Sequence, residues 1–93
     1  MRTYEAVCIF RAEEDKFSVG RDAVRTAIMG LGADSLKEDD MQVRSFAYPI
    51  EKVHSGHYYL YEFAMTPEKA HTIEHEVRLV PDLIRILVTR KDD

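Results

Sequence analysis

The residues best suited to chemistry lie in one short segment, H-T-I-E-H, from His71 to His75. Histidines four positions apart fall on one face of a helix, and Glu74 lies between them where a general base would be needed. This spacing matches the H-x-x-E-H pattern of zinc peptidases. A catalytic zinc also needs a third protein ligand and a walled cleft, which the sequence does not indicate. We therefore predict no metal site and no hydrolytic activity, and interpret the two histidines as exposed helix residues.

Other chemical groups are isolated. His54 and His57 lie on either side of a predicted turn, without a cysteine pair or carboxylate spacing that would complete a metal site. The sequence has no G-x-G-x-x-G, P-loop or G-x-S-x-G motif, so we predict neither a cofactor nor an enzyme. Cys8, the single cysteine, stands among apolar neighbours and is expected to be a small buried hydrophobe.

Composition and charge limit the function further. The 93 residues are 45% hydrophobic and 32% charged, which predicts one globular domain spanning 1–93. The chain opens without a secretory signal and has no long apolar run, so we expect it in the cytoplasm. A net charge of -4 argues against a protein that grips nucleic acid unaided.

The elements that must position these groups follow from periodicity. Alternation predicts a strand over 3–10, and helical spacing after a Ser18 cap predicts a helix ending near Gly30 and Gly32. An irregular strand, interrupted at 38–40 and resumed over 41–50, should pair with 57–65 around a turn at Ser55 and Gly56. Thr66 and Pro67 should begin a helix that ends before Pro81, and 83–89 should form the last strand.

The resulting order, βαββαβ, predicts an α+β, ferredoxin-like fold: a four-stranded antiparallel sheet with two helices on one face. The strands 3–10 and 57–65 should be central, and Pro49 fits near the end of an edge strand. Two sets of residues should point to opposite faces of the sheet. Ala6, Cys8, Phe10, Tyr61, Phe63, Ile86 and Val88 should face the helices, and Val7, Ile9, Tyr58, Leu60 and Leu87 the open side.

An open apolar face of this kind indicates a covering partner, which could be a protein, a ligand or a second copy. Scattered surface hydrophobes are the simpler alternative. The aromatic cluster over 58–63 could also stack on nucleic-acid bases, although aromatic residues in a central strand belong to the core more often.

Three segments together resemble a known family. They are M-R-T-Y-E at the start, R-x-F-A-Y-P-I-x-K-x-x-x-G-x-Y from Arg44 to Tyr58, and D-L-I-R-I-L-V-T-R from Asp82 to Arg90. In order and spacing they are similar to ribosomal protein six of the bacterial small subunit. Gln42, Phe46 and Glu51 depart from the residues usual in that family.

The resemblance implies a structural, noncatalytic protein of the ribosome. It implies a heterodimer with ribosomal protein eighteen of the small subunit, which binds the central domain of the small-subunit ribosomal RNA. Matching positions assign RNA contacts to Arg2, Arg44, Lys52 and Arg85, each of which could instead be a solvated charge or a surface ion pair. The alternative function is a ferredoxin-like homodimer that binds a small ligand across its sheet faces.

Overall fold

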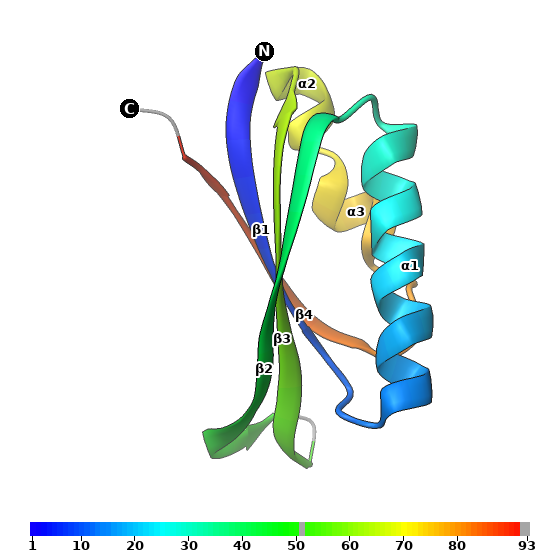
Figure 1. The fold of residues 1–93 in the computed structure, drawn as a ribbon, viewed down its shortest axis with the longest axis vertical. Helices are drawn as coiled ribbons and strands as arrows, with labels where there is room; N and C mark the ends of the chain where they lie inside the picture. The colour runs from blue at the N-terminus through cyan, green and yellow to red at the C-terminus, as the bar shows by residue number, and fades with distance from the viewer. Residues whose placement is uncertain (51, 92–93) are drawn as a thin grey trace.

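The sheet holds four strands and carries all its helices on one face (Figure 1). The computed structural model describes residues 1–50 and 52–91. In chain order the elements are β1 (Arg2–Phe10), α1 (Glu14–Gly30), β2 (Asp34–Ile50), β3 (Val53–Met65), α2 (Pro67–Ala70), α3 (Ile73–Val77) and β4 (Leu83–Arg90). The strand order is β2-β3-β1-β4, and each neighbouring pair is antiparallel. The predicted ferredoxin-like fold, with β1 and β3 central, is confirmed.

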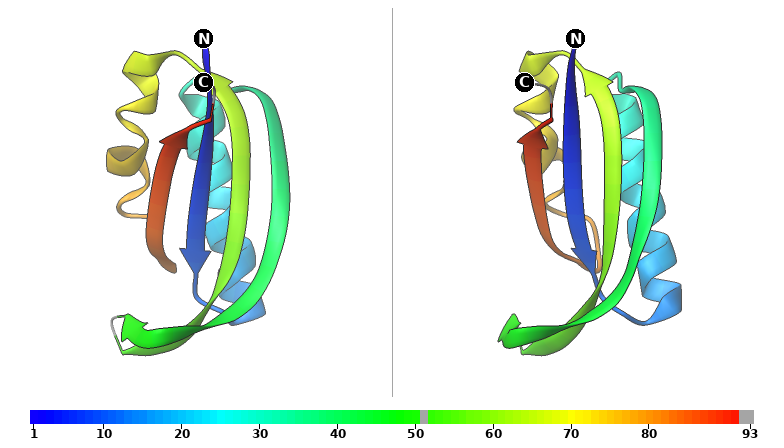
Figure 2. Two further views of the ribbon diagram at one scale, coloured as in Figure 1. Left: turned by 90° about the vertical axis from the view of Figure 1, so that its left-hand side faces the viewer. Right: turned by 60° about the vertical axis from the view of Figure 1, so that its left-hand side comes forward.

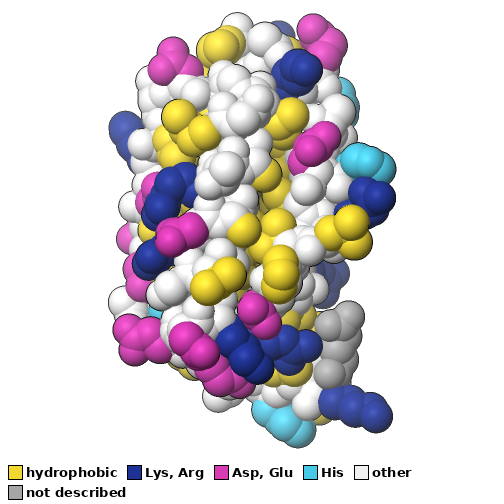
Figure 3. All heavy atoms as spheres, turned by 90° about the vertical axis from the view of Figure 1, so that its right-hand side faces the viewer, with side chains coloured by type: hydrophobic (Ala, Val, Ile, Leu, Met, Phe, Trp, Pro, Cys, Tyr) yellow, Lys and Arg dark blue, Asp and Glu magenta, His cyan; other side chains and the backbone are white. Residues whose placement is uncertain are grey.

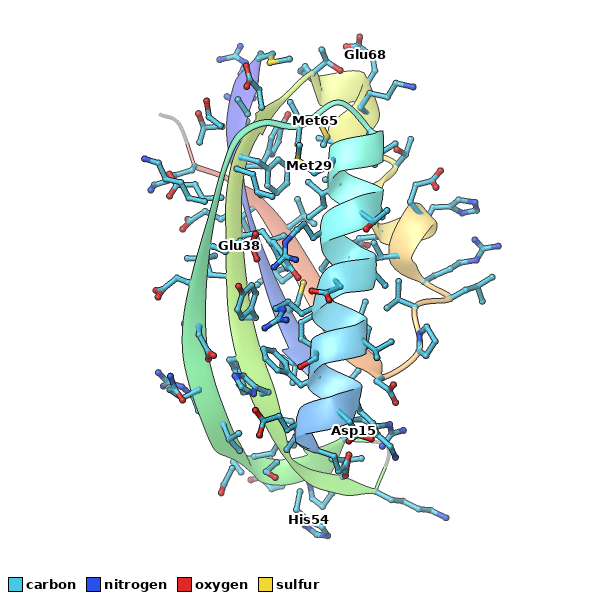
Figure 4. The ribbon with its side chains drawn as sticks, turned by 45° about the vertical axis from the view of Figure 1, so that its right-hand side comes forward. Asp15, Met29, Glu38, His54, Met65 and Glu68 are labelled. Atoms are coloured by element: carbon cyan, nitrogen blue, oxygen red, sulfur yellow. The ribbon has the colours of Figure 1, made fainter. Side chains whose placement is uncertain are left out.

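The core lies between the sheet and the helices, as alternation along the strands predicted. Ala6, Cys8 and Phe10 of β1 are fully buried. Tyr61 of β3 is also fully buried, and Phe63 is 1% exposed. Met65 closes the same layer near α2 (Figure 4). Ile86 and Val88 pack against this core from β4. Seen from the helix side, hydrophobic atoms gather in the seam between α1 and the segment around α3, and charged side chains line the outside (Figure 3).

The first helix begins earlier than predicted. α1 starts at Glu14, with Glu13 as its N-cap residue, so Ser18 lies inside the helix and does not cap it. Glu14 and Asp15 occupy the first turn, where carboxylates are stabilised by the positive end of the helix dipole. Phe17 is buried, which ties this first turn to the core.

The acidic segment 38–40 does not interrupt β2. The strand runs through it, with shifts of register between Asp34 and Lys37 and again between Asp40 and Gln42. Gln42 has a positive φ of 72°, and its backbone N–H donates to Asp40 Oδ1 at 2.8 Å. The predicted irregularity is therefore a pair of bulges. At the bulge between Asp34 and Lys37, the backbone N–H of Ser35 donates to Asp34 Oδ1 at 2.9 Å.

β2 ends at Ile50 as predicted, but the turn of the β2–β3 hairpin comes earlier in the chain than predicted, because β3 already begins at Val53. Ser55 pairs with Ser45 and Gly56 with Arg44, so both predicted turn residues are inside β3. The chain reverses between Ile50 and Val53, where Lys52 has a φ of 67°. Glu51, Asp92 and Asp93 lie outside the described residues.

The second predicted helix is two short ones. α2 ends at Ala70 and α3 begins at Ile73. At the break, the Thr72 hydroxyl donates to the Lys69 carbonyl at 2.7 Å, a local bond that competes with helical pairing. Pro67 does lie in the first turn, as predicted, although the Thr66 side chain forms no capping bond. Among the helices of the described residues, none combines the length and apolar character needed to cross a membrane.

Candidate functional site

The face of the sheet without helices carries an apolar row that crosses three strands. Val7 of β1 is the register partner of Leu60 on β3 and of Leu87 on β4. Val7 and Leu60 are half-buried, and Leu87 is 60% exposed. We call these three residues the apolar row. Because neighbouring strands lie about 4.8 Å apart, the three side chains form one continuous strip.

The other two predicted partner residues lie beside this row but are better covered. Ile9 pairs with Tyr58, and Ile9 is only 9% exposed. Phe46 of β2 lies over this position, with its ring 6.3 Å from that of Tyr58. A Cβ built on Gly56 would lie 2.5 Å from Ile9 Cγ2 and 2.9 Å from Phe46 Cζ. Because Gly56 has no side chain, Phe46 and Ile9 can both approach its backbone. Ile9 therefore offers little surface to a partner.

Two of the four predicted RNA contacts share this face. Arg85 pairs with Ile9 from β4, and Arg44 lies on β2 with its guanidinium 5.9 Å from the centre of the Tyr58 ring. Arg44 pairs with Gly56, which lies two residues from Tyr58 along β3 and on the same face. The two arginines therefore flank Ile9 and Tyr58, next to the apolar row.

The other two predicted RNA contacts, Arg2 and Lys52, are at opposite ends of the molecule. Arg2 begins β1 beside Met65, and Lys52 lies in the turn at the far end of the hairpin. The longest axis of the chain measures 37 Å, so an RNA that touched both would have to follow the whole length of the sheet.

The far end of the β2–β3 hairpin is a feature that sequence reasoning missed. β3 stops pairing with β1 at His57, and the remaining two-stranded segment bends across the lower end of the sheet toward the β4 side (Figure 2). We call residues 44–50 and 53–56 the ribbon. Tyr48, within the ribbon, is 82% exposed. The Tyr48-Pro49 pair marked this segment in the sequence, but it indicated only the end of an edge strand.

A polar network joins α1 to β2 on the opposite side of the sheet. Glu38 points from β2 toward α1 (Figure 4). Arg25 donates to both its carboxylate oxygens, at 2.8 and 2.6 Å, and the Tyr59 hydroxyl donates at 2.7 Å. The hydrogen bond from Arg25 is the main reason that the pKa of Glu38 is lowered, and the Tyr59 hydroxyl adds to this. These bonds hold a structural ion pair, which the sequence did not predict.

His57 and Asp40 form a second link between the hairpin and α1. His57 Nε2 lies 2.6 Å from Asp40 Oδ1, and its ring stacks on Phe17 at 3.5 Å. His57 therefore lies in β3, within the predicted strand 57–65, and its ring packs on α1. His54 remains exposed and lies at the outer end of the hairpin (Figure 4).

The H-T-I-E-H segment does not form the helix face assumed for a zinc site. The break between α2 and α3 falls on His71 and Thr72, so the two histidines are not on one continuous helix. His71 and Glu74 line a shallow pocket of about 280 Å³ with Tyr4 and Arg90, whereas the ring of His75 contacts Arg78. Among the described residues, no group of three or more potential ligands is placed to hold a metal ion.

Cys8 and the aromatic residues on the helix side of β3 are buried. Cys8 is buried, as expected, and burial raises the pKa of its thiol to about 12, which keeps it protonated and unreactive. Tyr59, Tyr61 and Phe63 face the helices and are buried, so they cannot stack on nucleic-acid bases. Burial also raises the pKa of Tyr61, whose hydroxyl donates to the Arg21 carbonyl at 2.7 Å.

Comparison with known proteins agrees with this geometry. The model of the family described as ribosomal protein S6 matches residues 3–90. The chain belongs to that family. The small ribosomal subunit protein bS6 of Treponema pallidum is 38% identical over 92 residues, covering 99% of both chains. The bS6 protein of Treponema denticola is 29% identical over the full length of both.

Solved structures give the same result. The crystal structure of 30S ribosomal protein S6 from Thermotoga maritima superposes with a TM-score of 0.83 at 26% identity, covering 97% of this chain and 87% of that one. The C-terminal domain of the MgtC protein from Mycobacterium tuberculosis, with a TM-score of 0.55 and 12% identity, shares the fold alone. Membership of the S6 family makes this chain a structural protein of the small ribosomal subunit. RNA association, and the cytoplasmic ribosome as its location, follow from the family.

Proposed function

We propose that this chain pairs with ribosomal protein eighteen through the open face of its sheet, and that the pair binds the central domain of the small-subunit ribosomal RNA. The chain itself acts as a structural component, without catalysis, a metal or a cofactor. The observation that carries the proposal is the apolar row of Val7, Leu60 and Leu87 on the face away from the helices, where Leu87 is 60% exposed.

The negative net charge of the chain favours RNA binding together with a basic partner protein. The chain has a net charge of -4, so its surface as a whole repels phosphate. Arg44 and Arg85 nevertheless lie on the same face as the apolar row. A basic partner seated on the row would bring RNA to these two arginines, and would supply the positive charge that this chain lacks.

The proposal is tested by placing a charge on the row. Leu87→Glu and Leu60→Glu should each weaken binding to purified ribosomal protein eighteen by at least about 100-fold, because an unpaired charge buried in an interface costs several kcal/mol. Calorimetry gives the affinities, and circular dichroism shows whether the variants fold. Val19→Glu, at an exposed position on α1 in the helix layer, is the matched control and should bind normally.

The same samples distinguish the alternatives. Sedimentation of the wild-type chain alone should show a monomer, and wild-type protein added to small ribosomal subunits lacking it should co-sediment with them. Unchanged affinity in folded Leu87→Glu would show that the open face is not the interface. A stable dimer of the chain alone, dissociated by Leu87→Glu, would favour the homodimer instead.

A further inference from the structure

The outer part of β2 contains four residues that face a single residue of β3. Ser45 pairs with Ser55 and Ile50 pairs with Val53, so the stretch from Phe46 to Pro49 stands opposite His54 alone. Three extra residues in one strand of an antiparallel pair force the chain to bulge outward. Phe46 turns back onto Tyr58, and Tyr48, two positions further along, is left 82% exposed. The bulge therefore presents a flat aromatic ring to the outside.

Tyr48 is separate from the apolar row. From Leu60 to His54, which stands opposite the bulge, β3 advances six residues, or about 20 Å. Between them lie Ile9 and Phe46, which cover each other within this chain. A partner seated on the apolar row would thus leave the outer end of the ribbon accessible.

Charge along β2 changes sign between its two halves. Residues 34–40 contain four acidic residues and one lysine. From 41 to 56 the sequence has Arg44 and Lys52, with His54 and the single acid Glu51. An exposed aromatic ring on a basic projection suits an anionic ligand with planar groups. Proteins recognise RNA outside helices in this way, with unpaired bases stacked on aromatic rings and phosphates near basic side chains.

We propose that Tyr48 stacks on an unpaired base of the ribosomal RNA, with Lys52 and Arg44 near the adjoining phosphates. This contact rests on the proposed function, because it requires the chain to be bound beside RNA. It adds an RNA site at the bulge of β2, outside the positions that the family resemblance assigned. Tyr48 takes part through its ring faces, and its hydroxyl is not needed.

Substitution of Tyr48 tests the stacking directly. The chain and ribosomal protein eighteen are titrated with a transcript of the RNA central domain, and binding is measured at several salt concentrations. Tyr48→Ala should weaken RNA binding by about 5- to 150-fold. Tyr48→Phe should stay within about twofold of wild type, since the ring is kept. The salt dependence of Tyr48→Ala should equal that of wild type, because no phosphate contact is lost. Leu79→Ala, 80% exposed beyond α3, is the matched control and should bind normally.

A fluorescent variant gives an independent readout. The chain contains no tryptophan, so Tyr48→Trp introduces a single indole at the proposed site. Its fluorescence should be quenched when the transcript is added, after the signal of the partner with wild-type chain is subtracted. Leu79→Trp should not be quenched.

The outcomes separate this contact from the function on which it rests. If Tyr48→Ala lowers affinity for ribosomal protein eighteen in the absence of RNA, the ribbon is a protein interface and the RNA contact is refuted. Unchanged RNA binding by Tyr48→Ala, or no quenching of Tyr48→Trp, also overturns it while leaving the proposed function intact. If the wild-type pair fails to form or to bind the transcript, both proposals fail.

Discussion

At the scale of single residues, Glu38 is held by three side-chain hydrogen bonds. Its carboxylate receives both donors of the Arg25 fork and the Tyr59 hydroxyl. An Arg–carboxylate pair bonded in this bidentate way is stronger than a single ion pair. Glu38 links α1 to the edge strand β2, so protonation of its carboxylate should lower the free energy of unfolding of the whole domain.

We expect this network to make stability depend on pH in the acid range. The folded-state pKa of Glu38 lies below its ordinary value of 4.5, so the unfolded chain binds the proton more readily. The stabilisation is therefore present above about pH 4.5 and is lost as the pH falls through the folded-state value. Urea unfolding between about pH 6 and 3 should show a shallower decline for Glu38→Gln than for wild type.

Tyr59→Phe provides the intermediate case for this prediction. It removes one donor and keeps the ring that packs on Phe17 and Tyr61. The free energy of unfolding at neutral pH should fall by about 1 to 2 kcal/mol, and the acid dependence should be partly reduced. Parallel curves for wild type and Glu38→Gln would mean that the carboxylate contributes nothing specific.

At the scale of elements, the bend of the β2–β3 hairpin depends on the absence of one side chain. A Cβ at Gly56 would meet Ile9 Cγ2 at 2.5 Å, Phe46 Cζ at 2.9 Å and the Phe10 carbonyl oxygen at 3.1 Å. The two side chains could rotate, but the carbonyl oxygen is backbone. The ribbon can therefore bend at this point only where β3 carries a glycine.

Gly56→Ala should destabilise the domain by about 1 to 3 kcal/mol, since it overpacks a close contact. Chemical denaturation measures the change. Gly30→Ala is the matched control, because nothing lies within 4 Å of the added carbon and the residue ends α1. That variant should be as stable as wild type or up to about 1 kcal/mol more stable. Equal stability of Gly56→Ala and wild type would show that the ribbon adapts.

Gly56 also explains why the hairpin turn was predicted at the wrong residues. Ser55-Gly56 has the composition of a turn, and only the approach of Ile9 and Phe46 in the folded protein shows that the glycine is needed for space. The bulge at Gln42 likewise depends on a bond from its backbone to Asp40. By contrast, element order and strand alternation are local signals, and they predicted the fold, the core and both faces of the sheet correctly.

For the candidate site, alternation placed all five predicted partner residues on the open side of the sheet. It could not show that Ile9 is covered by a residue of β2, because exposure depends on how the ribbon curls. Nor could it show that Arg44 and Arg85 flank the same pair of residues, since strand pairing between β4, β1 and β3 decides that. Their roles remain predictions.

At the scale of the whole molecule, the face without helices carries charges of both signs. Glu5 pairs with Glu62 and Asp39 with Leu60, on the same side of the sheet as Arg85. Acidic residues concentrate at the start of α1 and along the first half of β2, and Arg44 and Arg85 lie on the face that carries the apolar row. A protein with a net charge of -4 can approach RNA through such a face only if the phosphates meet few of its carboxylates. RNA contact should therefore involve a small number of basic side chains.

Removal of a true phosphate contact should be visible in the salt dependence of RNA binding. Each neutralised phosphate contributes about one unit to the slope of log affinity against log salt. Arg44→Ala and Arg85→Ala, titrated with the partner and the central-domain transcript, should each flatten the slope by about one unit. Arg78→Ala, an exposed arginine after α3 on the helix side, should leave it unchanged. Affinity for ribosomal protein eighteen alone should be the same in all three variants. If Arg85→Ala weakens that affinity and leaves the slope unchanged, Arg85 contacts the partner protein and not the RNA, and the phosphate contact must be assigned to Arg44 alone.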